Sequence, residues 1–322
     1  MRTRRILGRL VLAAIGATPP ALAADAWLRG QVGKCGVTPF QTSTVDGLPH
    51  LLFPGRSTLY KGAQVRINAQ GFRGENFAPP PAGHERIALI GDSVTFGNGC
   101  PEDGTLAVQL ATELAARGKP AQVLNCGIPG YNADNVAVLL RERVMPLRPQ
   151  RVVWVMVAND VSASLDRSQI PDDAIIDSFA EFPLGSPLLQ MLNQNASGLL
   201  RRMGVQLDGY VESILRASRR ADGERLRQAL TGMQATCRAA GIDFRVAIYP
   251  FMTRLATNPF APVEEGCARL CAELAIPSVR LADAFPPDEN LMRYWVGPLD
   301  GHPNGDAHRI AAGLLATRYF SD

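Results

Sequence analysis

The stretch Arg86-Ile87-Ala88-Leu89-Ile90-Gly91-Asp92-Ser93 decides the fold class of this chain. Its apolar part is short and ends at a glycine, which is typical of a strand buried on both faces of a parallel sheet. A polar pair, Asp92 and Ser93, follows at once, and a glycine-bearing turn at 95–99 comes next. Because ligands bind beyond the carboxyl ends of strands in an open parallel sheet, the sequence predicts a functional site at this serine.

Similar apolar runs recur along the chain and alternate with helical patterns. The predicted strands cover residues 86–90, 122–125, 152–157, 244–249 and 278–281. The predicted helices cover about 105–117, 134–144, 223–240, 263–274 and 306–319. This alternation predicts an α/β fold, a doubly wound three-layer sandwich around a mostly parallel five-stranded sheet of the flavodoxin-like type.

The composition is that of an ordinary globular protein, with 46% hydrophobic and 20% charged residues among 322. It excludes a disordered chain, a coiled coil and a polytopic membrane protein. The formal charge of +3 becomes −1 when the four arginines of residues 1–9 are set aside. A nearly neutral body gives no electrostatic reason to expect nucleic acid as a partner.

The N-terminus has the layout of a secretory signal peptide. Residues 1–9 are basic, residues 10–24 are apolar and small, and Ala21-Leu22-Ala23 offers a cleavage site. A retained membrane anchor is the alternative, but the run is shorter than the roughly 20 residues that a span needs, and Pro19-Pro20 interrupts it. We therefore expect removal of residues 1–23, no stable membrane span afterwards, and a periplasmic or secreted protein.

The remaining chain is predicted to have two parts. Residues 24–84 are rich in Gly, Pro and polar residues, and we expect them to form an extension packed on a main domain that spans 85–322. A helical insert at about 161–222 interrupts the main domain. Its Leu- and Met-rich portion, 184–204, is either a lid over an acyl chain or, as is commoner, a helical excursion that packs on the domain.

Six cysteines in an exported chain make disulfides an expectation, although they allow 15 pairings. Cys267 and Cys271 share one face of a predicted helix, and Cys237 on the preceding helix could pair with either. Cys126 at the end of a strand could instead be a buried apolar residue. No cluster of cysteine and histidine has the spacing of a zinc site, so we expect no metal.

Three further segments bring reactive groups to the same edge of the predicted sheet. The second strand runs into a glycine-rich turn at 127–130, whose backbone N–H groups can point at a ligand oxygen. The third strand ends at Asn159, and a late loop carries Asp300 and His302. On position alone Ser93 could equally be a helix cap. The convergence of a hydroxyl, an imidazole and amide donors favours a nucleophile with its general base.

These four segments, in this order, resemble the motifs of the SGNH hydrolases, also called the GDSL family. The resemblance covers most of residues 85–320, and Gly71-Phe72-Arg73-Gly74 is similar to a segment that precedes the domain in many exported members. It implies an ester hydrolase that works without a metal or an organic cofactor.

The resemblance also implies a role for each site residue. Ser93 is the nucleophile, His302 the general base, and Asp300 the acid that orients the imidazole. The oxyanion hole consists of the backbone N–H groups of Ser93 and Gly130 and the side-chain amide of Asn159.

Two positions depart from the family pattern. Val157 stands where the Gly-x-Asn-Asp motif has glycine, and a positive φ at that position would exclude valine. Asp300 precedes His302 by two residues rather than three, with Leu299 at the usual place of the acid. Either Asp300 reaches the ring through a different loop shape, or a backbone carbonyl orients His302 and Asp300 is a loop residue.

Structural roles are expected for the other polar candidates. His308 lies within the last helix and is predicted to be on the surface, while His50 and His84 have no partner motif. Asp92 and Asp160 are expected to hold their turns by local hydrogen bonds.

The sequence thus predicts an exported serine esterase that hydrolyses acyl or acetyl esters on small molecules, polysaccharide or other envelope material. Two alternatives stay open: acetyl transfer to a sugar hydroxyl, and a catalytically silent carbohydrate-binding protein on the same fold. The sequence does not indicate an oligomeric state.

Overall fold

The computed structural model describes residues 22–23, 26–27, 36–161, 222–297 and 300–320. The chain divides into two compact units, and nearly all described residues belong to the unit made of 33–169, 209–296 and 300–322. Of the other unit, two short helical pieces at 22–23 and 26–27 and residue 297 are described. The predicted signal segment, apart from its last two residues, and the stretch at 184–204 lie outside the described residues.

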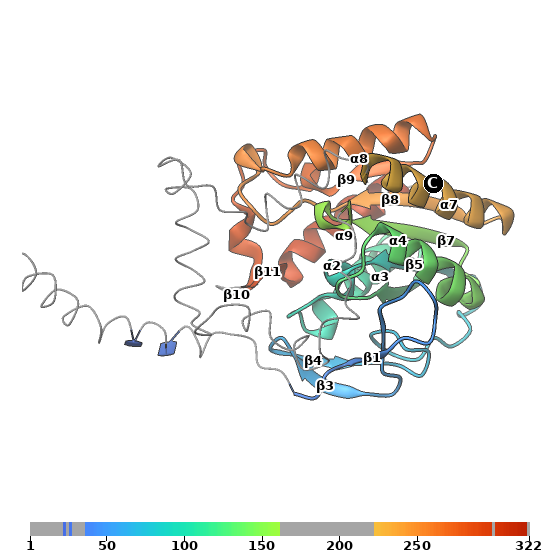
Figure 1. Ribbon diagram of the computed structural model, residues 1–322, viewed down its shortest axis with the longest axis horizontal. Coiled ribbons are helices and arrows are strands. Elements are labelled where there is room, and N and C mark those ends of the chain that lie inside the picture. Colours follow the sequence, from blue (N-terminus) through green and yellow to red (C-terminus); the bar gives the residue numbers. More distant parts are fainter. Residues whose placement is uncertain (1–21, 24–25, 28–35, 162–221, 298–299, 321–322) are drawn as a thin grey trace, which may run out of the picture. The chain divides into compact units, whose positions relative to one another are not determined.

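A five-stranded, all-parallel sheet forms the centre of the larger unit (Figure 1). Its strands lie in the order β6-β5-β7-β8-β9, so that β5 pairs with both β6 and β7. The strands are β5 (Glu85–Gly91), β6 (Ala121–Gly127), β7 (Arg151–Met156), β8 (Asp243–Ile248) and β9 (Ser278–Arg280). The order reverses beside β5, and ligands bind at such a reversal, beyond the carboxyl ends of the strands, in open parallel sheets. The predicted fold class is confirmed.

Helices cover both faces of the sheet. α3 (Leu106–Ala116) and α9 (Gly305–Tyr319) pack against each other and bury one set of alternate strand residues, which includes Leu89 and Val155. α4 (Ala133–Leu139), α7 (Asp222–Ala239) and α8 (Ala261–Glu273) pack together on the opposite side (Figure 1). Because successive strand residues point to opposite faces, both faces of β5 and β7 are apolar, as the continuous runs in the sequence indicate.

One predicted helix differs from the observed one. The helix expected over 134–144 is α-helical only to Leu139 and continues as a π-helical turn at Leu140–Val144. A 3₁₀ turn that contains Pro146 follows. Proline has no N–H to donate and its ring crowds the preceding turn, so the α-helical pattern cannot run on to this point.

The N-terminal extension forms two antiparallel hairpins. β1 (Phe40–Thr42) pairs with β2 (His50–Leu52), and β3 (Ser57–Tyr60) pairs with β4 (Ala63–Arg66). The sequence indicates only one strand-like piece in this region, around Val65-Arg66-Ile67, because strands of three or four residues carry too little alternation to be recognised.

Buried side chains fasten this extension to the main domain. The Arg73 guanidinium donates to the carbonyl oxygens of Phe96, Gly97 and Cys100 at 3.1, 2.5 and 2.6 Å. Burial lowers the pKa of Arg73 to about 10, which still leaves the side chain charged at neutral pH. His50, for which no partner motif was predicted, is also buried, and its Nε2 lies 2.9 Å from the carbonyl oxygen of Pro129. The turns after β5 and β6 are therefore both tied to the extension.

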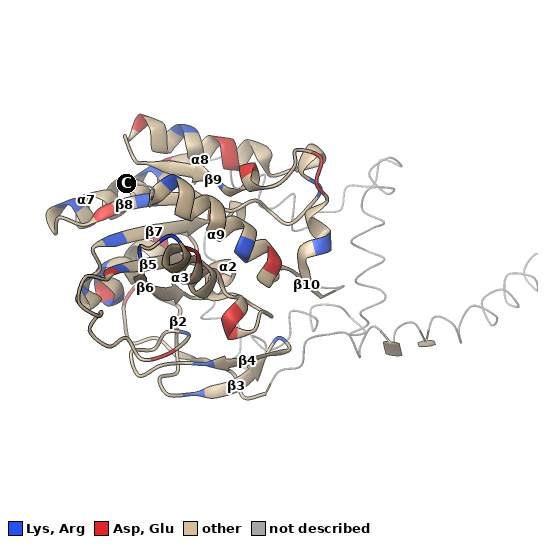
Figure 2. Ribbon diagram, turned by 180° about the vertical axis from the view of Figure 1, so that it is seen from behind, with Lys and Arg blue, Asp and Glu red and all other residues tan. Residues whose placement is uncertain are grey.

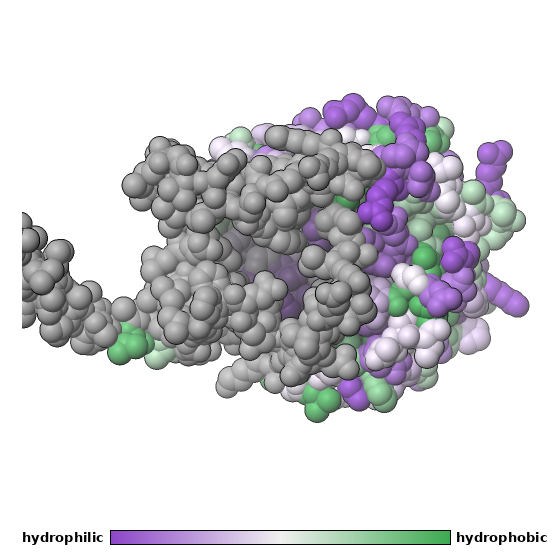
Figure 3. Space-filling view, viewed as in Figure 1, coloured by the Kyte–Doolittle hydropathy of each residue, from purple (hydrophilic) through white to green (hydrophobic). Residues whose placement is uncertain are grey.

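The described surface has a mixed character. Acidic and basic residues are interspersed over the helices when the molecule is seen from behind (Figure 2). Hydrophilic residues are spread over the described part of the opposite face, with apolar residues scattered between them (Figure 3). Within the described ranges no helix combines the length and the apolar character that crossing a membrane requires.

The expected disulfide between Cys237 and either Cys267 or Cys271 is not formed. The five described cysteines carry free thiols and are all buried: Cys100, Cys126, Cys237, Cys267 and Cys271. Cys35 lies outside the described residues.

Candidate active site

The turn after β5 is built to present Ser93. The short helix α2 (Ser93–Phe96) begins directly beyond the strand, and Asp92 is its N-cap, with Oδ1 accepting from the Val94 N–H at 2.9 Å. Ser93 is therefore the first residue of the helix and not its cap, which excludes the capping role that its position alone allowed. Its hydroxyl is left for other partners.

Glycines let α2 lie closely on the ends of the strands. A Cβ at Gly127, the last residue of β6, would overlap the backbone of Thr95 and Phe96. A Cβ at Gly91 would stand 2.7 Å from the Val155 carbonyl oxygen and would overlap the Thr95 side chain. Since no larger residue fits at these two positions, the glycines fix the close approach of α2 to the strands, and this places Ser93 at the carboxyl end of β5.

The predicted base and acid lie on a small hairpin, β10 (Trp295–Gly297) with β11 (Asp300–Pro303). Residues two apart on a strand point to the same side, so Asp300 and His302 share a face of β11. Oδ1 of Asp300 contacts His302 Nδ1 and also accepts from the His302 backbone N–H at 3.1 Å. The spacing of two residues thus brings the carboxylate to the imidazole without a longer loop.

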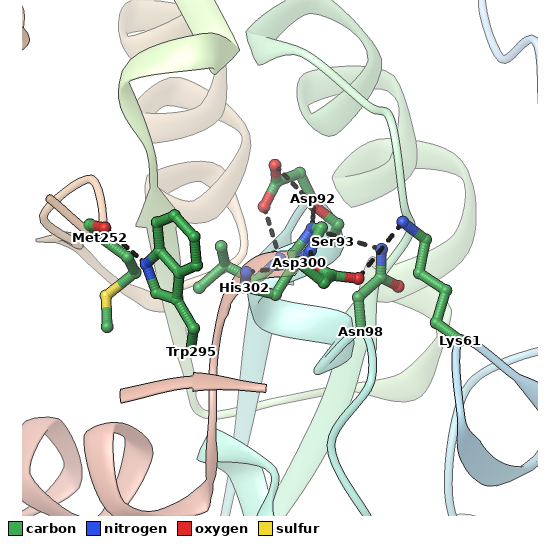
Figure 4. A network of polar contacts seen from close by, with 9 residues as sticks. Lys61, Asp92, Ser93, Asn98, Met252, Trp295, Asp300 and His302 are labelled. Carbon is green, nitrogen blue, oxygen red and sulfur yellow. Dashed lines mark hydrogen bonds and ion pairs between the residues drawn. The ribbon is translucent and has the colours of Figure 1, made fainter. Parts of the chain in front are cut away.

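The side chains of His302 and Ser93 contact each other (Figure 4). His302 Nε2 lies 2.9 Å from Ser93 Oγ, and the Asn98 side-chain amide lies 3.4 Å from the same nitrogen. An ionised carboxylate can only accept a hydrogen bond, so its contact with Nδ1 places the ring proton there. Nε2 then faces the serine hydroxyl with its lone pair.

Asp300 is held in its ionised form. Burial by itself would raise the pKa of Asp300, but the hydrogen bond and charge of His302 and the charge of Lys61 outweigh it and lower the pKa below its usual range. Lys61 Nζ lies 3.7 Å from Asp300 Oδ2. The carboxylate is therefore available as an acceptor at neutral pH.

Asn159 approaches the serine from the third strand. It lies in a 3₁₀ turn, Ala158–Val161, that follows β7, and its Nδ2 donates to Asp92 Oδ2 at 3.0 Å. The same carboxylate oxygen lies 3.3 Å from Ser93 Oγ. Asp92 thus holds its turn, as expected, and also links Asn159 to Ser93.

Valine at position 157 fits this turn without strain. Val157 does not have a positive φ, and its N–H donates to Asp160 Oδ2 at 3.0 Å. Burial, together with the charge of Asp92, raises the pKa of Asp160 well above its usual range. The departure from glycine therefore leaves the backbone that carries Asn159 in an ordinary conformation.

Gly130 stands in the turn after β6, at the same carboxyl edge as Ser93 and Asn159. It has a φ of 79°, a left-handed conformation that favours glycine, and it is exposed. Among the described residues no hydrogen bond joins Gly130 to Ser93.

The expectation that His308 lies on the surface is wrong. His308 is fully buried on α9, and its Nδ1 lies 3.3 Å from the Tyr249 hydroxyl. Burial, with the charges of Arg73 and His302, lowers the pKa of His308 to about 3. Helical periodicity places residues on a face, but only the packing of α9 on the sheet shows that this face is covered.

Two residues that face the site were missed by the sequence analysis. Asn98 lies in the glycine-bearing turn after α2, where a polar residue gave no specific signal. Lys61 lies in the turn between β3 and β4, some thirty residues before Ser93, and nothing in its local sequence indicates that it reaches the acid. Among the described residues no group of His, Cys, Asp and Glu is arranged to hold a metal ion.

The chain belongs to the GDSL-like lipase/acylhydrolase family, whose model matches residues 89–310. The resemblance seen in the sequence is confirmed, and the protein is a hydrolase that acts on ester bonds. No curated protein matches the sequence.

Several solved structures are similar at low identity. A lipase from a goat rumen metagenome is 12% identical, with 73% of this chain and 98% of that chain covered and a TM-score of 0.46. The acetyl xylan esterase AlAXEase is 12% identical, with 73% and 100% covered and a TM-score of 0.45. A catalytic mutant of Axe2, an acetylxylan esterase from Geobacillus stearothermophilus, is 15% identical, with 73% and 94% covered and a TM-score of 0.44. Similarity at this level does not indicate a substrate.

Proposed function

We propose that this protein is a serine esterase in which Ser93, His302 and Asp300 act as a catalytic triad. The observation that carries the proposal is the continuous chain of contacts from Ser93 Oγ through both ring nitrogens of His302 to the Asp300 carboxylate. A serine hydroxyl is a weak nucleophile by itself and needs an adjacent base to accept its proton. This arrangement supplies the base and a carboxylate that fixes its tautomer.

The reaction follows from this geometry. His302 Nε2 accepts the Ser93 proton while Oγ attacks the ester carbonyl, which gives a tetrahedral intermediate with a negative oxygen. The imidazolium then returns its proton to the leaving alcohol as the carbon–oxygen ester bond breaks, and an acyl-serine remains. Water repeats the sequence on the acyl-serine, which releases the acid and restores Ser93.

The oxyanion donors in this proposal are the Ser93 and Gly130 N–H groups and the Asn159 amide. They follow the carboxyl ends of β5, β6 and β7, which are neighbours in the sheet. The bond to Asp92 uses one hydrogen of the Asn159 amide and fixes its plane beside Ser93. Donors fixed in advance stabilise the developing negative charge without reorganisation.

We further propose that the protein is exported. Its proposed substrate is an acyl or acetyl ester on small-molecule or polysaccharide material. The basic and apolar leader before Ala24 supports removal of residues 1–23 and a periplasmic or secreted location. Residues 24–84 are then an extension of the hydrolase domain, and 161–222 an insert within it. N-terminal sequencing of the protein from an exporting host should find a chain that begins near Ala24, whereas a chain that keeps its leader would contradict export.

Hydrolysis of a short-chain aryl ester tests the proposed function. We expect Ser93→Ala to lower kcat by several orders of magnitude, because removal of such a nucleophile leaves only the contribution of binding and the oxyanion donors. Ser57→Ala, an exposed serine on β3, is the matched control and should be unchanged. Equal rates in the wild type and Ser93→Ala would contradict the proposal and favour the silent binding protein. Acyl transfer to an added sugar faster than hydrolysis would favour the transferase.

A further inference from the structure

The hairpin that carries the acid and the base is a peripheral element. β10 and β11 form a two-stranded sheet separate from the five-stranded one. The side chains of Asp300 and His302 are 24% and 23% exposed, whereas the strand ends that hold Ser93 are buried. A carboxylate on such a hairpin needs contacts beyond its own strand if it is to keep its orientation.

Asp300 uses its two oxygens for different partners. Oδ1 contacts His302 twice, through Nδ1 and the backbone N–H, and Oδ2 faces Lys61 Nζ at 3.7 Å. Figure 4 shows the Lys61 ammonium directed at the Asp300 carboxylate, next to the contact between His302 and Ser93. A cation on the outer oxygen opposes rotation of the carboxylate away from the imidazole.

The backbone around Lys61 is fixed against the site. Lys61 has a left-handed φ of 49° at the turn between β3 and β4. A Cβ at Gly99 would stand 3.4 Å from the Lys61 carbonyl oxygen and 2.7 Å from the Val296 side chain. Three elements therefore meet at Gly99: the turn of the extension, the turn after α2 and strand β10. A side chain larger than glycine would not fit between them.

We propose that Lys61 is a positioning residue of this active site, which holds the Asp300 carboxylate against His302 by pairing with its second oxygen. This inference rests on the proposed function. Lys61 lies outside the residues 89–310 that the family model matches, so the family pattern does not supply it. The extension thereby contributes to the chemistry of the site as well as to its packing.

Other charged groups surround the pair and stay in place when Lys61 is replaced. Asp92 lies beside Ser93 on the turn after β5, the Arg73 guanidinium binds the turn after α2, and His308 lies buried on α9 below the hairpin. Lys61 is the cation that pairs directly with Asp300 in the described structure. Its removal should therefore favour the imidazolium at position 302, since a nearby cation opposes a second positive charge.

The pH dependence of kcat/KM in Lys61→Met and Lys61→Arg tests the inference. Both residues tolerate the left-handed φ about as well as lysine does, so the turn should fold. We expect the acid limb of Lys61→Met to move to higher pH by roughly 0.3 to 1 unit, from the Coulomb interaction of two nearby charges in partly screened surroundings. The kcat should fall about 3- to 10-fold with KM unchanged, and Lys61→Arg should stay close to the wild type.

Arg269→Met, which removes an exposed charge on α8, is the control and should leave the profile unchanged. An acid limb of Lys61→Met that coincides with the wild type or moves to lower pH would overturn the inference, as would a Lys61→Arg profile equal to that of Lys61→Met. Failure of the proposed function is separate, because it would appear in the wild type as ester hydrolysis that does not depend on Ser93.

Discussion

The two halves of the proposed active site are supported in different ways. The nucleophile half consists of turns that leave the central sheet, where Gly91, Gly127 and the Asp92 cap fix the chain among buried neighbours. The base half is a partly exposed hairpin, anchored by the Trp295 indole N–H on the Met252 carbonyl oxygen at 2.7 Å and by the Lys61 pair. In this molecule the core positions the hydroxyl, and polar contacts near the surface position the imidazole.

This difference predicts how substitutions in each half affect folding and activity. A change at Gly91, Gly127 or the Asp92 cap of the nucleophile half disturbs buried packing and alters folding together with activity. A change in the base half breaks a few polar contacts and should alter the rate and its pH dependence while the fold persists. Substitutions in the two halves can therefore be compared directly.

The largest effect is expected in the base half, from Asp300→Asn. The amide can donate to Nδ1 and favour the wrong tautomer of His302, so we expect kcat to fall about 10³- to 10⁴-fold with little change in thermal stability. Kinetics with an aryl ester and a melting curve measure both quantities. Asp306→Asn, an exposed residue at the start of α9, is the matched control. A loss below tenfold would show that Asp300 does not orient the base.

A smaller loss is expected in the nucleophile half, from Asn159→Ala. Removal of one oxyanion donor costs about 100- to 1000-fold in kcat, and KM should change little because the donor acts mainly in the transition state. The exposed Asn76→Ala is the control and should be silent. If KM rises while kcat stays constant, Asn159 binds the substrate and does not stabilise the oxyanion.

The smallest effect concerns stability in acid. Burial lowers the pKa of His308 to about 3, so below the usual histidine range the unfolded chain binds a proton that the folded chain does not. Stability should therefore decrease as the pH falls from about 6.5, by at most about 1.4 kcal/mol per pH unit from this group.

Urea unfolding at pH 7.5 and at pH 5 measures this loss. His308→Gln, which has no proton to bind, should lose less stability over the same interval. An equal loss in both proteins would show that other groups cause the acid sensitivity.

Much of the fold could be predicted because its signals are local. Each core strand is a short apolar run, and the five predicted strands lie within about two residues of those observed. Ser93 and Asn159 follow the ends of β5 and β7 within a few residues. They could therefore be assigned from their position and from the family resemblance. The hairpins of the extension could not, since strands of three or four residues depend on their pairing partners for stability.

The sequence by itself determined the order of strands and helices, and with it the edge at which a hydroxyl, amide donors and an imidazole collect, because periodicity and strand-end position are properties of neighbouring residues. Tertiary structure alone decided that a spacing of two residues brings Asp300 into contact with His302, that His308 is buried, and that Lys61 of the extension pairs with Asp300. Those facts depend on contacts between residues far apart in the chain, which no local pattern encodes.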